Sequence, residues 1–167
     1  MVYNALAATA VGYALGMTDR EICAGIEANV PIAGRNNLIR APHFTIIDDC
    51  YNANPQAMEA ALEILADTAC RRRVAVLGDM GELGELTVSA HRAIGVLAGE
   101  LHIDAVIAVG EKARGIAAEA PNAQWYAAAE DALPAVRAAF GPDTALLVKA
   151  SHAMHMETIV KELEAQT

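Results

Sequence analysis

Residues 74–84 read VAVLGDMGELG, and they join two kinds of secondary structure through one polar loop. Val74 to Leu77 is a short β-rich run, the glycines of the loop permit a tight turn, and residues 87–101 continue as a long helical run. A strand that leads into a helix in this way is typical of a mostly parallel α/β sheet.

The same alternation extends in both directions from this stretch. β-rich runs are expected at residues 38–40, 44–48, 74–77, 105–109, 124–126 and 146–149. Helices are expected at residues 55–67, 87–101, 111–119, 128–140 and 154–164. Asn54 before Pro55 predicts an N-cap with proline in the first turn, and Ala41-Pro42-His43 is short enough to close a hairpin. The sequence therefore predicts an α/β fold with helices flanking the sheet.

A helical pair is predicted ahead of the sheet. Apolar residues recur at helical spacing over residues 4–15, and Thr18 with Glu21 forms a capping-box pattern for a second helix. The Pro and Gly interruption at residues 29–35 predicts a linker and a domain boundary. Because a helix follows Met1 almost directly, we expect the chain to be cut from a longer protein.

Composition narrows the class of protein. With 12 basic and 21 acidic side chains the formal charge is 12 − 21 = −9, and the chain is 54% hydrophobic. A folded core is expected, and nucleic-acid binding is disfavoured. The three cysteines show no CxxC spacing, which disfavours disulfides and thiolate zinc. The cysteine pattern fits a reducing setting, so a cytoplasmic protein is predicted. The longest apolar-rich stretch, residues 2–17, is too short to span a bilayer.

Three polar loops follow strands, at residues 48–54, 78–84 and 149–152. The carboxyl ends of parallel strands meet at one sheet edge, so these loops are expected to converge there. The loop at 78–84 has GxxGxxG spacing with Asp79 and Glu82, and these charges disfavour a phosphate cradle. It is either a structural turn or a place where carboxylates hold a cation, an ammonium group or a partner's side chain.

The other two loops also leave alternatives open. DDCYNANP, residues 48–55, is suited to ribose and base contacts, or is a polar loop that only caps a helix. Lys149 at a strand-to-helix junction suits a carboxylate or phosphate, and Ser151 is a binding hydroxyl rather than a nucleophile. His152 and His155 lack a third ligand, so no metal site is predicted. His91 is expected to be a packed or surface histidine.

Four strings taken together resemble the carboxyl-terminal domain of the Mur ligases. They are GRNNLIR (34–40), IDDCYNANPQAM (47–58), VAVLGDMGELG (74–84) and LVKASHAMHME (147–157). Residues 34–167 are similar to that domain, which implies a Rossmann-like sheet without a dinucleotide site. Residues 1–33 resemble the closing helices of the family's central ATPase domain plus a linker.

The resemblance implies an ATP-dependent amide ligase of peptidoglycan precursor synthesis. The branch of the family concerned joins D-alanyl-D-alanine to UDP-MurNAc-tripeptide through an acyl phosphate. ATP and Mg²⁺ would be bound mainly by the missing central domain, because this sequence has no P-loop, and the missing amino-terminal domain would complete the protein. No catalytic residue is therefore assigned within this chain, which is expected to be inactive alone.

The family motifs also imply nucleotide contacts. Arg35 matches an arginine that reaches the ATP phosphates, and Asp49 matches an acid that bonds the ribose. Tyr51, Asn52 and Asn54 would line the same loop.

Contacts with the amino substrate are implied by the later motifs. Asp79 and Glu82 would face the ammonium group of the dipeptide, and Lys149 and Ser151 would face its carboxylate. His152, in the same motif, is also expected to contact the substrate. The expected form of this motif is KGSR, whereas this chain has KASH, so His152 replaces an arginine and its permanent charge.

Two other functions remain open on the sequence alone. One is an independent α/β module that binds a nucleotide or small anionic metabolite without chemistry. The other is an interaction domain whose alanine-rich amino-terminal helices dock on a protein partner.

Overall fold

The computed structural model describes residues 2–29 and 34–165 of the chain. Contacts divide the chain into two units, Met1–Pro31 and Ile32–Thr167. Part of the predicted linker, residues 30–33, lies outside the described residues, and so does the predicted boundary between residues 33 and 34. Each unit is treated by itself below.

The first unit is the predicted helical pair, α1 (Val2–Ala14) and α2 (Asp19–Glu27). The capping box is confirmed, because the Thr18 side chain accepts the Glu21 N–H while the Glu21 carboxylate accepts the Thr18 N–H. These bonds satisfy backbone donors at the start of α2. The bonds that the Glu21 carboxylate accepts from the Thr18 N–H and hydroxyl lower the pKa of Glu21. The motif therefore fixes where the second helix begins.

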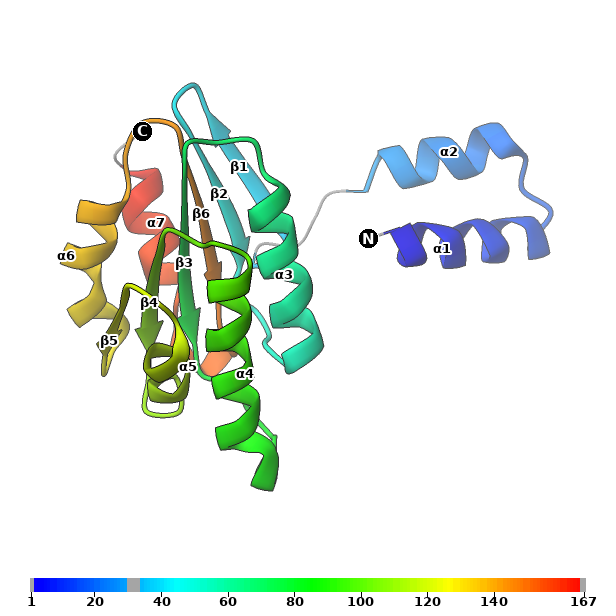
Figure 1. Ribbon diagram of the computed structural model, residues 1–167. Coiled ribbons are helices and arrows are strands. Elements are labelled where there is room, and N and C mark those ends of the chain that lie inside the picture. The colour runs from blue at the N-terminus through cyan, green and yellow to red at the C-terminus, as the bar shows by residue number, and fades with distance from the viewer. Residues whose placement is uncertain (1, 30–33, 166–167) are drawn as a thin grey trace. The chain divides into compact units, whose positions relative to one another are not determined.

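The second unit is built on a six-stranded sheet with the order β1-β2-β6-β3-β4-β5 (Figure 1). Its strands are β1 (Asn37–Ala41), β2 (Phe44–Asp49), β3 (Arg72–Gly78), β4 (Ala105–Val109), β5 (Ala123–Tyr126) and β6 (Thr144–Lys149). β1 pairs with β2 as the predicted antiparallel hairpin, and the other pairings are parallel. The mostly parallel α/β fold is confirmed.

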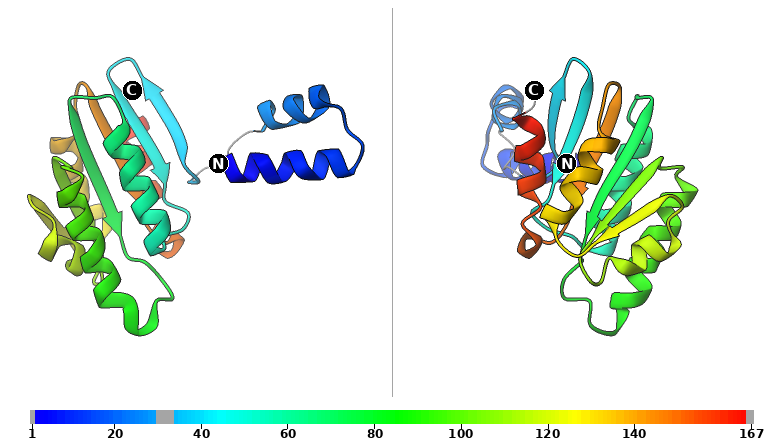
Figure 2. Two further views of the ribbon diagram at one scale, coloured as in Figure 1. Left: turned by 45° about the vertical axis from the view of Figure 1, so that its right-hand side comes forward. Right: turned by 90° about the vertical axis from the view of Figure 1, so that its left-hand side faces the viewer.

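Helices cover both faces of this sheet (Figure 2). They are α3 (Pro55–Asp67), α4 (Thr87–Glu100), α5 (Arg114–Glu119), α6 (Ala129–Ala139) and α7 (Glu157–Glu164). One hydrophobic cluster joins α3, α4 and α5 to the sheet, and a second joins α6 and α7 to the opposite face. The result is a three-layer domain.

The central strand β6 shows how the sequence produces these layers. All its residues are buried, with Ala145 and Leu147 in the first cluster and Leu146 and Val148 in the second. Successive side chains of a strand point to opposite faces, so a continuous apolar run fits a strand covered on both sides. Each fully buried leucine contributes about 1.5–3 kcal/mol relative to exposure.

The start of α3 was predicted correctly, whereas the start of α5 was not. α3 begins at Pro55 as expected, because Asn54 caps it by accepting the Ala57 N–H at 2.8 Å. The predicted helix start at Glu111 is wrong, since residues 111–113 form a turn whose Ala113 N–H is donated to another loop.

The predicted start of the last helix at Met154 is also wrong. His155 adopts φ 50°, a left-handed conformation that interrupts helical geometry. A short 3₁₀ turn, His152–Met154, therefore precedes it, and α7 begins at Glu157.

Candidate functional site

The three polar loops meet at the carboxyl edge of the sheet, as predicted. Lys149 at the end of β6 donates to the Asp49 carboxylate at the end of β2, with 2.5 Å between Nζ and Oδ2. Two residues further on, the Ser151 hydroxyl accepts the Gly81 N–H at 2.9 Å, and the Ser151 N–H is donated to the Asp79 carbonyl. The end of β6 thus ties the two other loops together.

Arg35 stands in a turn that two aspartates hold in place. The Gly34 N–H is donated to Asp48 Oδ2 at 2.9 Å, and the Asn36 N–H is donated to Asp49 Oδ1 at 2.9 Å. Gly34 has φ 76° and Asn36 has φ 52°, so both residues beside Arg35 are left-handed. Glycine and asparagine are the residues that adopt this conformation most readily, which explains the GRN string.

Tyr51 contacts two potential ligand-binding side chains. The Arg35 guanidinium carbon lies 4.2 Å from the centre of the Tyr51 ring, and the His152 ring stacks on Tyr51 with centroids 5.3 Å apart. All three residues are exposed. A cation over an aromatic face contributes about 0.5–1 kcal/mol at an exposed site. The histidine that replaces the expected arginine therefore has an aromatic partner here.

Lys149 lies inside the protein, with a side chain only 2% exposed. Besides Asp49, its ammonium group donates to the Asn52 carbonyl at 2.8 Å. These bonds link β6 to the loop that carries Tyr51 and Asn52. The structure thus gives Lys149 a supporting task, and its contact with a substrate carboxylate stays a prediction.

The loop at residues 78–84 is held by neighbouring elements. Asp79 Oδ1 accepts the Ala113 N–H at 2.8 Å, and Met80 is fully buried. Glu82 is exposed with φ 59°. Asp79 is therefore partly engaged, whereas Glu82 projects from a strained turn at the surface.

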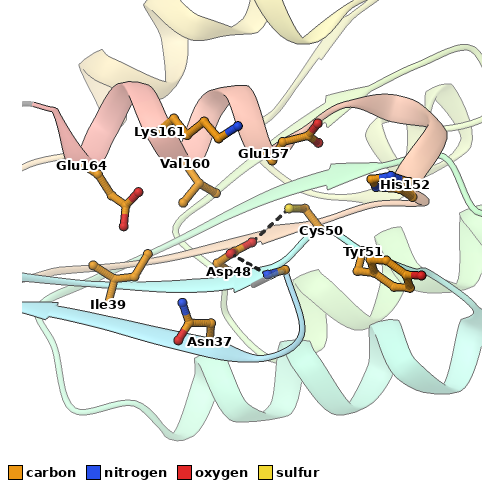
Figure 3. A pocket seen from close by; sticks show the side chains of 11 residues that line it. Asn37, Ile39, Asp48, Cys50, Tyr51, His152, Glu157, Val160, Lys161 and Glu164 are labelled. Atoms are coloured by element: carbon orange, nitrogen blue, oxygen red, sulfur yellow. Dashed lines mark hydrogen bonds between the residues drawn. The ribbon is translucent and has the colours of Figure 1, made fainter. Parts of the chain in front are cut away.

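A pocket of about 290 Å³ lies between α7 and the β1–β2 hairpin (Figure 3). Its lining is Gly34, Asn37, Ile39, Asp48, Cys50, Tyr51, His152, Glu157, Val160, Lys161 and Glu164. Partial burial acts to raise the pKa of Glu157, but hydrogen bonds from its own backbone and from His155 lower it below the usual value. Tyr51 and His152 bring this pocket next to the predicted nucleotide contacts.

Cys50 is buried at the inner side of this pocket and donates to Asp48 Oδ1 at 2.9 Å (Figure 3). Burial, the hydrogen bond to Asp48 and the nearby negative charge all raise the pKa of the thiol. The thiolate is the reactive form of cysteine, so we expect the Cys50 thiol to be unreactive at neutral pH.

Alkylation with iodoacetamide should distinguish buried Cys50 from exposed Cys23 in the folded chain. We expect exposed Cys23 to react readily, while buried Cys50 stays unmodified from pH 7 to pH 9. Peptide mass spectrometry gives the extent at each site, and urea-unfolded chain, where both thiols react, is the control. Rapid modification of native Cys50 at pH 7 would contradict the assignment.

Sequence reasoning missed some residues of this edge. Asp48 was not among the candidate residues. Two adjacent acids at the end of a strand could have indicated that each has its own partner, as the structure shows for Asp48 with Gly34 and for Asp49 with Asn36. Asn54 acts as the predicted cap, and its nucleotide contact stays a prediction. Buried His91, with both ring nitrogens bonded, carried no signal beyond its place in a helix.

Among residues 2–29 and 34–165, no three His, Cys, Asp or Glu side chains are grouped so that they could hold a metal ion. Within the same residues, no helix has the length and apolar character that crossing a membrane requires.

The layers and the converging loops define an α/β domain of the kind that places ligands at the carboxyl edge of its sheet. Residues 34–152 match the family model described as Mur ligase, glutamate ligase domain. The chain therefore belongs to the Mur ligase family.

Individual relatives agree with this assignment. A UDP-N-acetylmuramoyl-tripeptide--D-alanyl-D-alanine ligase of Mycobacterium leprae is 34% identical, over 97% of this chain and 36% of its own length. A ligase structure from Acinetobacter baumannii, named as adding D-alanyl-D-alanine, has a TM-score of 0.85 at 33% identity, over 97% of this chain and 36% of that one. The MurF ligase of Thermotoga maritima, solved with ADP, has a TM-score of 0.78 at 26% identity. The match covers 95% of this chain and 37% of that one. This chain thus spans little more than a third of the length of these three relatives.

Proposed function

We propose that this chain is the closing domain of an ATP-dependent ligase that adds D-alanyl-D-alanine to UDP-MurNAc-tripeptide. The relatives' names support the reaction, and the ADP-bound Thermotoga maritima ligase supports a nucleotide. In this proposal ATP activates the tripeptide carboxylate as an acyl phosphate, and the dipeptide amine displaces phosphate to form the amide. The preceding domains supply the P-loop and the Mg²⁺ site, and the helical pair α1–α2 is the carboxyl-terminal end of the central domain.

The observation that carries the proposal is the placement of Arg35. Asp48 and Asp49 bind the backbone on both sides of it, so the turn that carries Arg35 is held at the carboxyl edge without using the charge of the guanidinium group. Its guanidinium group rests on exposed Tyr51. An exposed cation on a held turn, next to an aromatic ring, is suited to the phosphates and base of a nucleotide held by a second domain.

The Arg35→Ala variant of the longer protein should test the nucleotide contact. We expect kcat/KM for ATP to fall about 10- to 100-fold, the loss of one or more charge-assisted hydrogen bonds. Stability should change little because the side chain is exposed. Arg40→Ala, which removes an exposed arginine of β1, is the control and should leave kinetics near wild type. An unchanged kcat/KM for ATP in Arg35→Ala would remove the assignment.

A second pair of variants tests the amino-substrate side. Asp79→Asn and Glu82→Gln remove negative charge from the loop, so we expect each to raise the KM for D-alanyl-D-alanine about tenfold, with little effect on the KM for ATP. Asparagine keeps an oxygen that can accept the Ala113 N–H. Glu85→Gln, the same change at an exposed neighbour, should be neutral. Equal effects on both KM values would contradict the assignment.

A further inference from the structure

His91 is a fully buried histidine of α4 whose two ring nitrogens are both used. Nε2 lies 3.0 Å from the Met80 backbone nitrogen, and Nδ1 lies 2.6 Å from the Thr87 carbonyl oxygen. An amide N–H can only donate, so Nε2 must be the acceptor and the ring proton must be on Nδ1. The contacts thus define a neutral ring in one tautomer.

The two bonds of His91 serve different purposes. The bond to Thr87 stays within α4, one turn back along the helix. The bond to Met80 leaves the helix and reaches the middle of the loop between Asp79 and Glu82. The Met80 bond is therefore the one through which α4 holds this loop.

Consecutive residues of the loop are held by three different elements. Asp79 accepts from Ala113, ahead of α5, and Gly81 donates to Ser151, after β6. Met80, between them, donates to His91 of α4. His91 therefore supplies the middle one of three hydrogen bonds that hold the residues leading to Glu82.

We propose that His91 is a positioning residue that sets the Asp79–Glu82 loop for the incoming amine. It touches no substrate and acts through the Met80 N–H. This inference rests on the proposed function, because the loop is assigned there to the dipeptide ammonium. It adds a buried residue of α4 to the parts that determine how tightly that substrate binds.

Two variants separate the two bonds of the ring. His91→Gln places an oxygen near the position of Nε2, so it can still accept the Met80 N–H. His91→Asn places an amide nitrogen near the position of Nδ1, so it can still donate to Thr87 but leaves the buried Met80 N–H without a partner. Both variants remove the same ring and add the same functional group.

In the longer protein we expect His91→Asn to raise the KM for D-alanyl-D-alanine about tenfold while the KM for ATP changes less than about twofold. His91→Gln should stay within about threefold of wild type for both. A merely structural role predicts equal kinetics for the two variants, or equal effects on both substrates, and either result would overturn the proposal.

A spectroscopic measurement on the unmodified chain covers the case in which a variant does not fold. Long-range ¹H–¹⁵N correlation should show His91 neutral, with its proton on Nδ1. A proton on Nε2, or a charged ring at neutral pH, would overturn the tie to Met80. A folded wild-type ligase without activity would instead overturn the proposed function, and the tautomer would still decide whether His91 binds Met80.

Discussion

Lys149→Met is expected to lower the free energy of unfolding of the sheet domain by about 3 kcal/mol. Methionine fills a similar volume but cannot donate, so the Asp49 carboxylate and the Asn52 carbonyl both lose the ammonium group. The value lies at the low end for a broken buried pair, because the Asp49 side chain is 19% exposed and water can solvate it in part. Urea unfolding followed by fluorescence of Trp125, the chain's single tryptophan, reports this domain.

Two comparisons make the Lys149 result specific. Lys112→Met, the same change at an exposed position, should stay within about 0.5 kcal/mol of wild type. Adding Asp49→Asn to Lys149→Met removes the charge left behind, so the double variant should be more stable than the two separate losses together predict. Additive losses would show that Lys149 and Asp49 do not stabilise each other.

Gly78→Ala is expected to cost about 2 kcal/mol, as overpacking in a filled core usually does. A Cβ atom at position 78 would lie 2.6 Å from the Ala150 Cβ, at the point where β3 and β6 end side by side. The backbone of Gly78 is not in the left-handed region, so the cost is steric rather than conformational. The glycine of the VAVLG string is thus required by the alanine of the KASH string.

The pair Gly78→Ala with Ala150→Gly tests this reasoning. In the double variant the methyl group added at position 78 occupies the space that the Ala150 methyl group fills in the wild type, so the clash is removed. The double variant should therefore be more stable than Gly78→Ala alone. Urea unfolding with Trp125 fluorescence measures each variant. If Ala150→Gly brings no recovery, the close approach of these strands does not set the cost.

Most of the fold was predictable because its signals are local. β6 reads as a continuous apolar run, and Asn54-Pro55 marks a helix start that depends only on neighbouring residues. The late starts of α5 and α7 were not predictable in this way. One depends on the contact between Ala113 and Asp79, and the other on the left-handed conformation of His155.

The position of the site was predictable, but the hydrogen bonds that hold its residues were not. Parallel strands with polar residues at their ends indicate a shared edge, and the structure confirms that the three loops meet there. The burial of Lys149 and the bond from Met80 to His91 join residues distant in sequence or hidden in a helical pattern. Such contacts depend on packing between elements, which no single motif encodes.

The most direct test of the proposed ligase is phosphate release by the longer protein with the preceding domains restored. We expect release only when ATP, UDP-MurNAc-tripeptide and D-alanyl-D-alanine are all present, and none from this chain alone. Mass spectrometry should then show the tripeptide extended by the dipeptide. A folded longer protein that binds ATP yet releases no phosphate with all three substrates would contradict the ligase assignment and favour an independent binding module.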